Sequence, residues 1–322
     1  MPSMLFRRRS PAAGSPDLAE AEPRERLAAV LAELRSTDLH AGRWVTDVLA
    51  GGFRTTFRGA GVEFSEVREY VEGDDPRSVD WNVTARVGRP MVKRYVEERE
   101  RTVVLALDGS VGMEAGLGAW SLRQAAARFC TLLGLAAIQN HDRLGLLLAG
   151  ARLDRLWLPN KGGGHVLRLL RQAVERPACA GPGDVDVLLG TAAARLRRRV
   201  VLFVLSDFAG ERPYRSLLPC ARRHDVVLVR LVAREHTAPP PCLLEVVDPH
   251  DGRVVAVDFA HAPTAAAWRA AAARQRQRRD EQFGRAGVDV VDVHLPQEAD
   301  VAAVVEPLQA FFHRRALREV KR

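Results

Sequence analysis

Cysteine is scarce in this chain and lysine is nearly absent. The four cysteines among 322 residues form no C-x-x-C pair. This spacing argues against a cysteine metal site or a redox motif and favours isolated thiols in a reducing compartment. Of the 48 basic residues, all but Lys93, Lys161 and Lys321 are arginines. Arginine and alanine are frequent along the whole chain, so we interpret the basic balance as a composition bias rather than as a binding surface.

Long hydrophobic runs are also missing. Apolar runs such as 132–138 and 200–205 are far shorter than the roughly 20 residues that a membrane-spanning helix needs. The arginines at 7–9 are not followed by an apolar segment, so the N-terminus does not have the pattern of a signal peptide. We therefore expect no membrane span, a cytoplasmic location, and a flexible basic tail over residues 1–24.

The overall composition is that of a globular protein. Apolar residues make up 47% and charged residues 27% of the chain, which excludes disorder throughout, collagen and a disulfide scaffold. The net charge of +8 is compatible with a nucleic-acid or anionic-membrane partner without requiring one.

From residue 101 onward, strand-type apolar runs alternate with helical patterns. The runs lie at 103–107, 144–148, 200–205, 226–232 and 288–293, and the helical patterns at about 120–139, 164–175, 186–198, 213–223 and 263–286. This alternation predicts an α/β domain over 101–322 with a doubly wound, mostly parallel sheet of the Rossmann type. We also predict a β-hairpin insertion near 243–259 and a last helix with Pro307 in its first turn.

The region 25–100 is more irregular and strongly charged. Residues 25–35 carry apolar side chains at i, i+3, i+4 and i+7, which predicts an amphipathic helix. A strand is expected at 91–97, and it could pair with the strand that follows at 102–107. We therefore predict an N-terminal segment that contains a helix and a β-hairpin.

Several common catalytic motifs are absent. The glycine-rich stretch 161–164 lacks the order of a nucleotide-binding P-loop, and the chain has neither a G-x-S-x-G elbow nor an H-E-x-x-H pair. Ser110 has no histidine partner that the sequence makes evident. The sequence therefore contains no complete catalytic constellation.

Two aspartates follow strands of the predicted sheet. Asp108 and Ser110 come after the first strand, and Asp207 follows a later one. Ligands of open α/β sheets bind outside the carboxyl ends of the strands, and carboxylate and hydroxyl oxygens suit Mg²⁺. The alternative is that these aspartates only cap helices or tighten turns.

The sequence around these residues resembles a known family. DGSVGM at 108–113 and SDF at 206–208 look like the metal-ion-dependent adhesion site of the von Willebrand factor A (vWA) fold. FRGAGVEF at 57–64, GDDPR at 73–77 and VKRY at 92–95 resemble the signature of the bacterial domain of unknown function 58 family. The resemblance runs from about residue 40 to the C-terminus. It implies a vWA-like adaptor that works with a MoxR-type AAA+ ATPase in protein maturation or complex assembly.

The metal site that this resemblance implies is degenerate. Its pattern is D-x-S-x-S, with a threonine on a second loop and an aspartate on a third. The chain has Asp108, Ser110 and Asp207, but Gly112 replaces the second serine and the loop 181–184 has no threonine. We therefore expect that no cofactor is required and that any Mg²⁺ binding is weak.

The N-terminal signature is rich in charged residues that could face a partner or could tie this segment to the sheet. Asp80 is the expected N-cap of a short helix, and we expect Trp81 to be buried against the 101–322 domain. The residues that carry either role are Arg58, Glu63, Arg68, Tyr70, Asp74, Asp75, Asp80, Trp81 and Arg86.

The resemblance and the missing catalytic constellation together predict a non-enzymatic protein-interaction module. Its expected partners are a MoxR-type ATPase and an unknown client protein. A metal-dependent hydrolase that uses Asp108 and Asp207 is one alternative. A nucleic-acid-binding protein is another, and it rests on net charge alone.

Overall fold

The chain divides into two units of very different size. The computed structural model describes residues 5–7, 23–36, 63–71, 74, 78–96, 101–179, 181–210, 212–248 and 252–320. Residues 57–101 form one unit, which we call the hairpin unit, and the rest of the chain forms the sheet unit.

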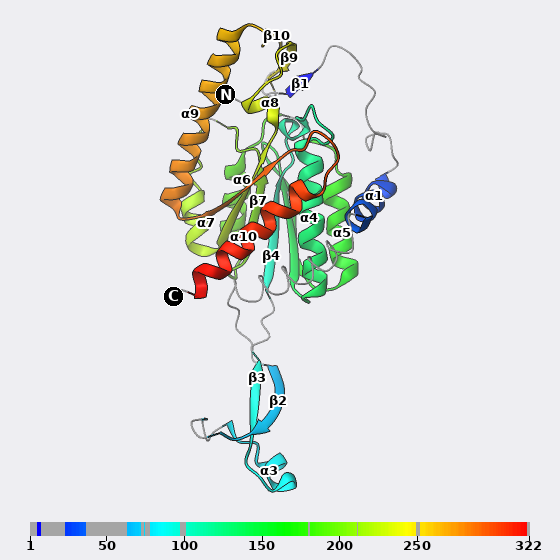
Figure 1. Ribbon diagram of the computed structural model, residues 1–322, viewed down its shortest axis with the longest axis vertical. Helices are drawn as coiled ribbons and strands as arrows, with labels where there is room; N and C mark the ends of the chain where they lie inside the picture. The colour runs from blue at the N-terminus through cyan, green and yellow to red at the C-terminus, as the bar shows by residue number, and fades with distance from the viewer. Residues whose placement is uncertain are drawn as a thin grey trace. The chain divides into compact units, whose positions relative to one another are not determined.

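The sheet unit is built on a six-stranded β-sheet with the order β11-β8-β7-β4-β5-β6 (Figure 1). Its strands are β4 (Thr102–Asp108), β5 (Arg143–Ala149), β6 (Leu153–Asn160), β7 (Val201–Ser206), β8 (Asp225–Val232) and β11 (Asp289–His294). All neighbours pair in parallel except β6, which lies antiparallel to β5 at one edge. Counted along the chain, the order is 3-2-1-4-5-6, that of a doubly wound fold.

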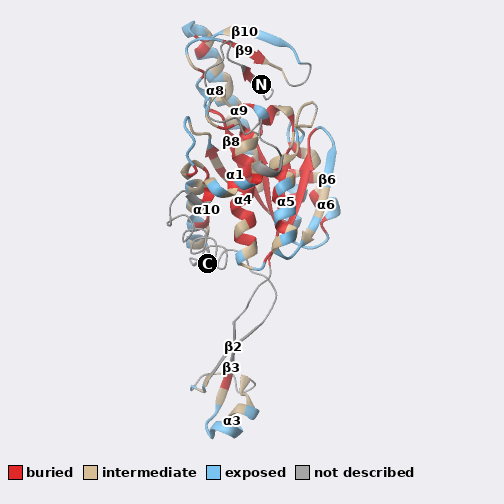
Figure 2. Ribbon diagram, turned by 90° about the vertical axis from the view of Figure 1, so that its right-hand side faces the viewer, coloured by how far each residue is buried: buried red, intermediate tan, exposed pale blue. Residues whose placement is uncertain are grey.

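The central strands are buried on both faces. Strand β4 (TVVLALD) is buried from its second residue to its last, and β5, β7 and β8 show similar continuous burial (Figure 2). Strands covered by helices on both sides need apolar side chains at every position rather than at every second one. The predicted doubly wound, mostly parallel α/β fold class is confirmed.

Helices cover both faces of this sheet. One face carries α4 (Leu122–Gln139), α5 (Gly163–Glu175) and α10 (Ala302–Val320), with α1 (Pro23–Ser36) packed on α4 and α5. The other carries α6 (Val185–Arg195), α7 (Leu217–Arg223) and α9 (Ala262–Ala286). Within the described ranges, no helix combines the length and apolar character needed to cross a membrane.

Helix α4 shows how local sequence and packing act together. The Ser121 hydroxyl accepts a hydrogen bond from the Gln124 N–H, and the Gln124 side chain accepts one from the Ser121 N–H, which forms a capping box. Gly134 lets α5 approach closely, because a Cβ atom there would lie 2.8 Å from Cδ2 of Leu170.

A second, smaller sheet in the sheet unit has the order β1-β9-β10. Strands β9 (Leu243–Val247) and β10 (Val254–Asp258) form the predicted hairpin insertion. Strand β1 (Leu5–Arg7) pairs antiparallel with β9, on the side of β9 opposite to β10. Part of the predicted flexible tail is therefore a strand, because Phe6 is buried there with Leu244, Val246 and Phe259.

The hairpin unit contains β2 (Glu63–Glu69), α3 (Trp81–Val87) and β3 (Met91–Val96). Strand β3 pairs with β2 and not with β4, so the predicted pairing of 91–97 with 102–107 is wrong. The reason is that β4 takes a central place, with β5 on one side and β7 on the other. The predicted segment 25–100 is also divided, since α1 packs with the sheet unit.

Local chemistry in the hairpin unit follows the sequence, but burial does not. Asp80 caps α3 by accepting hydrogen bonds from the backbone N–H groups of Asn82 and Val83, as predicted. Trp81 is 73% exposed and is therefore not buried within the hairpin unit. No described side chain of α3 is buried, because this short helix has a polar and apolar mixture on every face.

Two further elements of the sheet unit differ from expectation. Strand β6 was not predicted, because its exposed edge position leaves its apolar residues mixed with charged ones. Pro307 lies inside α10 rather than in its first turn. The helix begins earlier than expected because the Asp300 side chain accepts a hydrogen bond from the Ala302 N–H.

Candidate functional site

Asp108 and Asp207 lie at the same edge of the central sheet. Strands β4 and β7 are parallel neighbours with Leu107 opposite Leu205, so Asp108 and the Ser206–Asp207 pair emerge side by side. The chain crosses from one face of the sheet to the other between these two strands. Open α/β sheets bind their ligands at this point. The prediction that both aspartates share one sheet edge is confirmed.

The Asp108 carboxylate is buried and fully engaged. Its Oδ1 accepts a hydrogen bond of 2.9 Å from the Ser110 N–H, and its Oδ2 accepts one of 2.7 Å from the Ser206 hydroxyl. Burial and the nearby charge of Asp207 raise the pKa of Asp108 from 3.8 to about 6, and the hydrogen bonds only partly oppose this rise. Asp108 therefore takes up its proton at a higher pH than an ordinary aspartate does.

Asp207 has one satisfied and one unsatisfied oxygen. Its Oδ1 accepts a hydrogen bond of 3.0 Å from the Ala209 N–H. Its Oδ2 is buried, and no group within the described residues donates to it. The next residue, Phe208, has a φ of 52°, a conformation that is uncommon outside glycine. Phe208 is held there by its N–H bond to the Ser206 hydroxyl and by edge contacts with the rings of Tyr214 and Phe283.

The loop before α6 closes over the Asp108 side of the site. A Cβ atom on Gly183 would lie 2.7 and 2.8 Å from the Asp108 carboxylate oxygens and 2.8 Å from Oγ of Ser110. Only glycine fits at this distance. In the family pattern this second loop carries a threonine, and here a backbone without a side chain takes its place. Sequence reasoning did not single out Gly183 or Ser206, although both lie in stretches it had considered.

A cleft of about 820 Å³ opens beside the two carboxylates. Asp184 and Asp186 also line this cleft, but both cap backbone groups. The Asp184 side chain accepts from the Asp186 N–H, and the Asp186 side chain accepts from the N–H groups of Arg215 and Ser216. No histidine, cysteine or lysine lines the described part of the cleft.

The oxygen ligands at this site are of the type that a hard cation such as Mg²⁺ prefers, but there are too few of them to complete its coordination shell. Carboxylate and hydroxyl oxygens suit Mg²⁺. Gly112 lies buried in the short 3₁₀ helix Val111–Glu114 and brings no side-chain oxygen. Within the described ranges, no group of three or more histidine, cysteine, aspartate or glutamate side chains is placed to hold a metal. Any Mg²⁺ here would keep much of its water shell.

Comparison with known families places the chain. A family model described as "Protein of unknown function DUF58" matches residues 66–278. This chain belongs to the DUF58 family. Uncharacterized proteins of Mycobacterium tuberculosis and Mycobacterium bovis are 32% identical to this DUF58 protein over 208 residues. The match covers 62% of this chain and 64% of each relative, so the chain spans less than two thirds of their length.

Solved structures are more distant from this DUF58 protein. The conserved hypothetical protein BatB from Bacteroides thetaiotaomicron is 12% identical with a TM-score of 0.42, over 66% of this chain and 99% of BatB. The SpRpn10 VWA domain is 12% identical with a TM-score of 0.38, over 65% of this chain and 94% of that domain. The fold assignment rests on the order and direction of the strands.

The described signature residues of the DUF58 chain lie in the hairpin unit. Arg68 and Asp74 form a two-bonded ion pair of 2.8 and 2.7 Å, and the Tyr70 hydroxyl donates to the Asp74 carbonyl oxygen. The hydrogen bond from Arg68 lowers the pKa of Asp74. Arg68 and Asp74 therefore satisfy each other's charge within the hairpin unit.

Arg86 is exposed, and Glu63 lies in β2. Arg58 and Asp75 lie outside the described residues.

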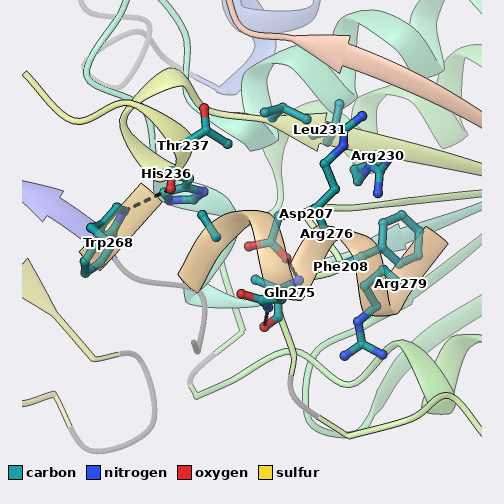
Figure 3. A pocket seen from close by; sticks show the side chains of 13 residues that line it. Asp207, Phe208, Arg230, Leu231, His236, Thr237, Trp268, Gln275, Arg276 and Arg279 are labelled. Atoms are coloured by element: carbon teal, nitrogen blue, oxygen red, sulfur yellow. Dashed lines mark hydrogen bonds between the residues drawn. The ribbon is translucent and has the colours of Figure 1, made fainter. Parts of the chain in front are cut away.

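A second, smaller cavity of about 100 Å³ also has Asp207 in its lining (Figure 3). Carboxyl-end residues of β8 and side chains of α9 line it. Arg230 on its wall pairs with Asp292 and Asp280, and the Trp268 indole N–H donates to the His236 carbonyl oxygen. Sequence reasoning missed this cavity, because its lining comes from segments far apart in the chain.

Proposed function

We propose that this DUF58 protein is a non-catalytic interaction module that presents the Asp108–Asp207 edge of its sheet to a partner protein. The observation that carries the proposal is the unsatisfied Oδ2 atom of Asp207 beside a cleft. A buried acceptor without a donor costs the fold about 1–3 kcal/mol. A binding partner or a cation that supplies the missing positive charge or donor would recover this free energy.

The cleft chemistry supports binding more than turnover. Hydrolases with a serine nucleophile need an adjacent base, and the cleft lining includes no histidine. The Ser206 hydroxyl already donates to Asp108. The Tyr214 hydroxyl also lines the cleft, but burial raises its pKa well above its usual range. The Tyr214 hydroxyl has no hydrogen-bond partner within the described residues, so no group there is placed to activate it.

The proposal includes Mg²⁺ as a ligand that the site binds with low affinity. Two neighbouring carboxylates repel each other, and a divalent cation relieves this repulsion. Asp108, Ser110 and Asp207 would hold such an ion, which would supply a positive charge for a partner's acidic group. The missing hydroxyl at Gly112 limits its affinity.

The proposed partner is a MoxR-type AAA+ ATPase together with a client protein, as the family resemblance implies. The interaction would take place in the cytoplasm. Neither partner is identified by the geometry, so the test uses the ATPase directly.

The experiment is affinity co-purification of the immobilised full-length protein with a MoxR-type ATPase from the same organism. We expect the unaltered chain to retain the ATPase and Asp207→Asn to retain at least about tenfold less, a loss of roughly 1.4 kcal/mol. Glu306→Gln is the matched control, because Glu306 is exposed on α10. Equal retention by Asp207→Asn and Glu306→Gln, or no retention by the unaltered chain, would reject the proposal.

A metal-dependent hydrolase is the second candidate, and one observation favours it. The raised pKa of Asp108 beside Asp207 resembles the unequal carboxylate pairs that act as acid and base in enzymes. Metal-dependent hydrolysis of p-nitrophenyl phosphate that is lost in Asp108→Ala would establish this alternative. Retention on DNA that falls steeply with salt would instead indicate nucleic-acid binding.

A further inference from the structure

The small sheet of the sheet unit has one strand that comes from far away in the sequence. Strand β1 pairs with β9 through only three residues, with Leu5 opposite Val247, Phe6 opposite Val246 and Arg7 opposite Glu245. Strand β9 pairs with β10 on its other side. Without β1, this side of β9 would be an open edge that presents unpaired backbone groups.

Phe6 sits in an aromatic pocket built by other elements. Its ring centroid lies 5.5 Å from those of His236 and Trp268 and 6.2 Å from that of Phe259. The pocket walls contact one another independently of Phe6. The Trp268 and Phe259 rings meet edge to face at 5.3 Å, and the Trp268 indole N–H donates to the His236 carbonyl oxygen over 2.9 Å (Figure 3).

The attachment of β1 is short. Ordering three residues removes backbone conformational freedom, and one buried phenylalanine side chain is the main described gain. These two effects are similar in size, so β1 binds its groove with little net stabilisation. Its connection to α1 through residues 8–22 keeps it at a high local concentration.

The pocket is continuous with the candidate functional site. His236 and Trp268 line both the Phe6 pocket and the small cavity that ends at Asp207. A chain segment bound in place of β1 would therefore lie next to the edge that the proposed function assigns to a partner.

We propose that the side of β9 that pairs with β1, together with its aromatic pocket, is a strand-exchange site for an extended segment of a partner protein. Strand β1 occupies this site within the same chain. Phe6 defines the ligand as an extended segment with an aromatic side chain opposite Val246, because its buried ring fills the aromatic pocket. Backbone pairing with β9 gives affinity, and the aromatic side chain gives specificity.

The test uses a fluorescein-labelled peptide of residues 4–9, MLFRRR, and the full-length chain. Fluorescence anisotropy measures binding to the unaltered protein, to Phe6→Ala and to the control Leu158→Ala, whose exposed leucine lies on β6. We expect the peptide to bind Phe6→Ala at least about tenfold more tightly than the other two proteins, because they keep the tethered competitor. The peptide MLARRR should bind none of them.

Hydrogen exchange supplies a second readout that shows whether the groove has formed. In Phe6→Ala, the amides of β9 that face β1 should exchange faster, and MLFRRR should restore their protection.

Three results would overturn the proposal. They are no binding of MLFRRR to Phe6→Ala up to about millimolar peptide, equal binding of MLFRRR and MLARRR, and a change from dimer to monomer caused by Phe6→Ala. The last result would identify a second copy of this chain as the occupant. Because these measurements use no ATPase, failure of the proposed function would leave them unaffected.

Discussion

Asp108 combines burial, two hydrogen bonds and a neighbouring carboxylate in one position. The sheet places it at the end of β4, and helices on both faces exclude water from the strand. Ionisation of Asp108 is therefore opposed by burial first and by the charge of Asp207 second. This residue makes the candidate site sensitive to pH.

The first prediction concerns pH. The pKa of Asp108 is about 6 in the folded protein against 3.8 as the ordinary value. The folded state binds this proton more tightly than the unfolded state. The contribution of Asp108 to the free energy of unfolding therefore falls as pH rises from about 4 to about 6. The full change in this contribution, from well below the lower pKa to well above the higher one, amounts to about 3 kcal/mol. The free energies of unfolding of the unaltered chain and of Asp108→Asn, measured with urea, should therefore diverge as pH rises over this range. The variant should become more stable relative to the unaltered chain. Parallel pH profiles would contradict the assignment.

The second prediction concerns Gly183. A methyl group there would meet three oxygen atoms at 2.7–2.8 Å, so Gly183→Ala should lower the free energy of unfolding by about 1–3 kcal/mol. Gly164→Ala is the matched control, because a Cβ atom at this helical position meets nothing within 4 Å. It should be neutral or should stabilise by up to about 1 kcal/mol. Equal unfolding midpoints for the two variants would show that the loop does not pack against Asp108.

The third prediction concerns Mg²⁺. Calorimetric titration of the unaltered chain should give a dissociation constant no lower than about 1 mM, or roughly −4 kcal/mol. Gly112→Ser should bind more tightly by adding a hydroxyl ligand, and Asp108→Ala should not bind. Micromolar binding by the unaltered chain would mean that other groups complete the shell. Absence of binding in Gly112→Ser would mean that the carboxylates do not form a cation site.

At the scale of elements, one arginine joins three of them beside the site. Arg230 on β8 bonds to Asp292 on β11 and to Asp280 on α9, and its own side chain is only 8% exposed. Burial alone would raise the pKa of Asp292, but the bonds from Arg230 lower it overall. This network positions α9, which carries Trp268 and Gln275, against the carboxyl ends of the strands.

The fourth prediction tests this network. Arg230→Leu should destabilise the protein by about 3–5 kcal/mol, because it leaves Asp292 without its buried partner. Arg285→Leu removes an ion pair with Glu281 in which the arginine is 82% exposed, so it should change stability by less than about 1 kcal/mol. Chemical denaturation measures both, and similar losses in the two variants would contradict the role of burial.

At the scale of the whole molecule, the two units differ in what holds them together. The sheet unit has a continuous apolar core, whereas the hairpin unit relies on strand pairing, a helix cap and ion pairs. Val71, Trp81 and Val87 are exposed in the hairpin unit. Tryptophans in the two units should therefore differ sharply in their importance for stability.

The fifth prediction compares these tryptophans. Trp120 is 3% exposed and lies under the Arg128 guanidinium at 4.1 Å, so Trp120→Ala should cost about 3–5 kcal/mol. Trp81→Ala should change stability by less than about 0.5 kcal/mol, because the indole is 73% exposed. Thermal unfolding followed by circular dichroism measures both. A large loss in Trp81→Ala would show that the residue is covered in solution.

The sequence by itself determined the doubly wound sheet and the place of Asp108 and Asp207 at its edge. Buried parallel strands appear as unbroken apolar runs, and the residues that end them are read directly from the chain. The cap at Asp80 was equally predictable, because it depends on neighbours two and three residues away.

Only the tertiary structure decided which strand pairs with β3 and that β6 forms the edge of the sheet. It also decided that Trp81 is exposed and that Phe6 is buried in an aromatic pocket. It also decided the proton affinity of Asp108 and the need for glycine at 183. Each depends on groups distant in sequence: Ser206 is 98 residues from Asp108, and Phe6 of β1 pairs with Val246 of β9. Local patterns indicate which segments are strands or helices, but contacts between distant segments set burial, charge and strand pairing.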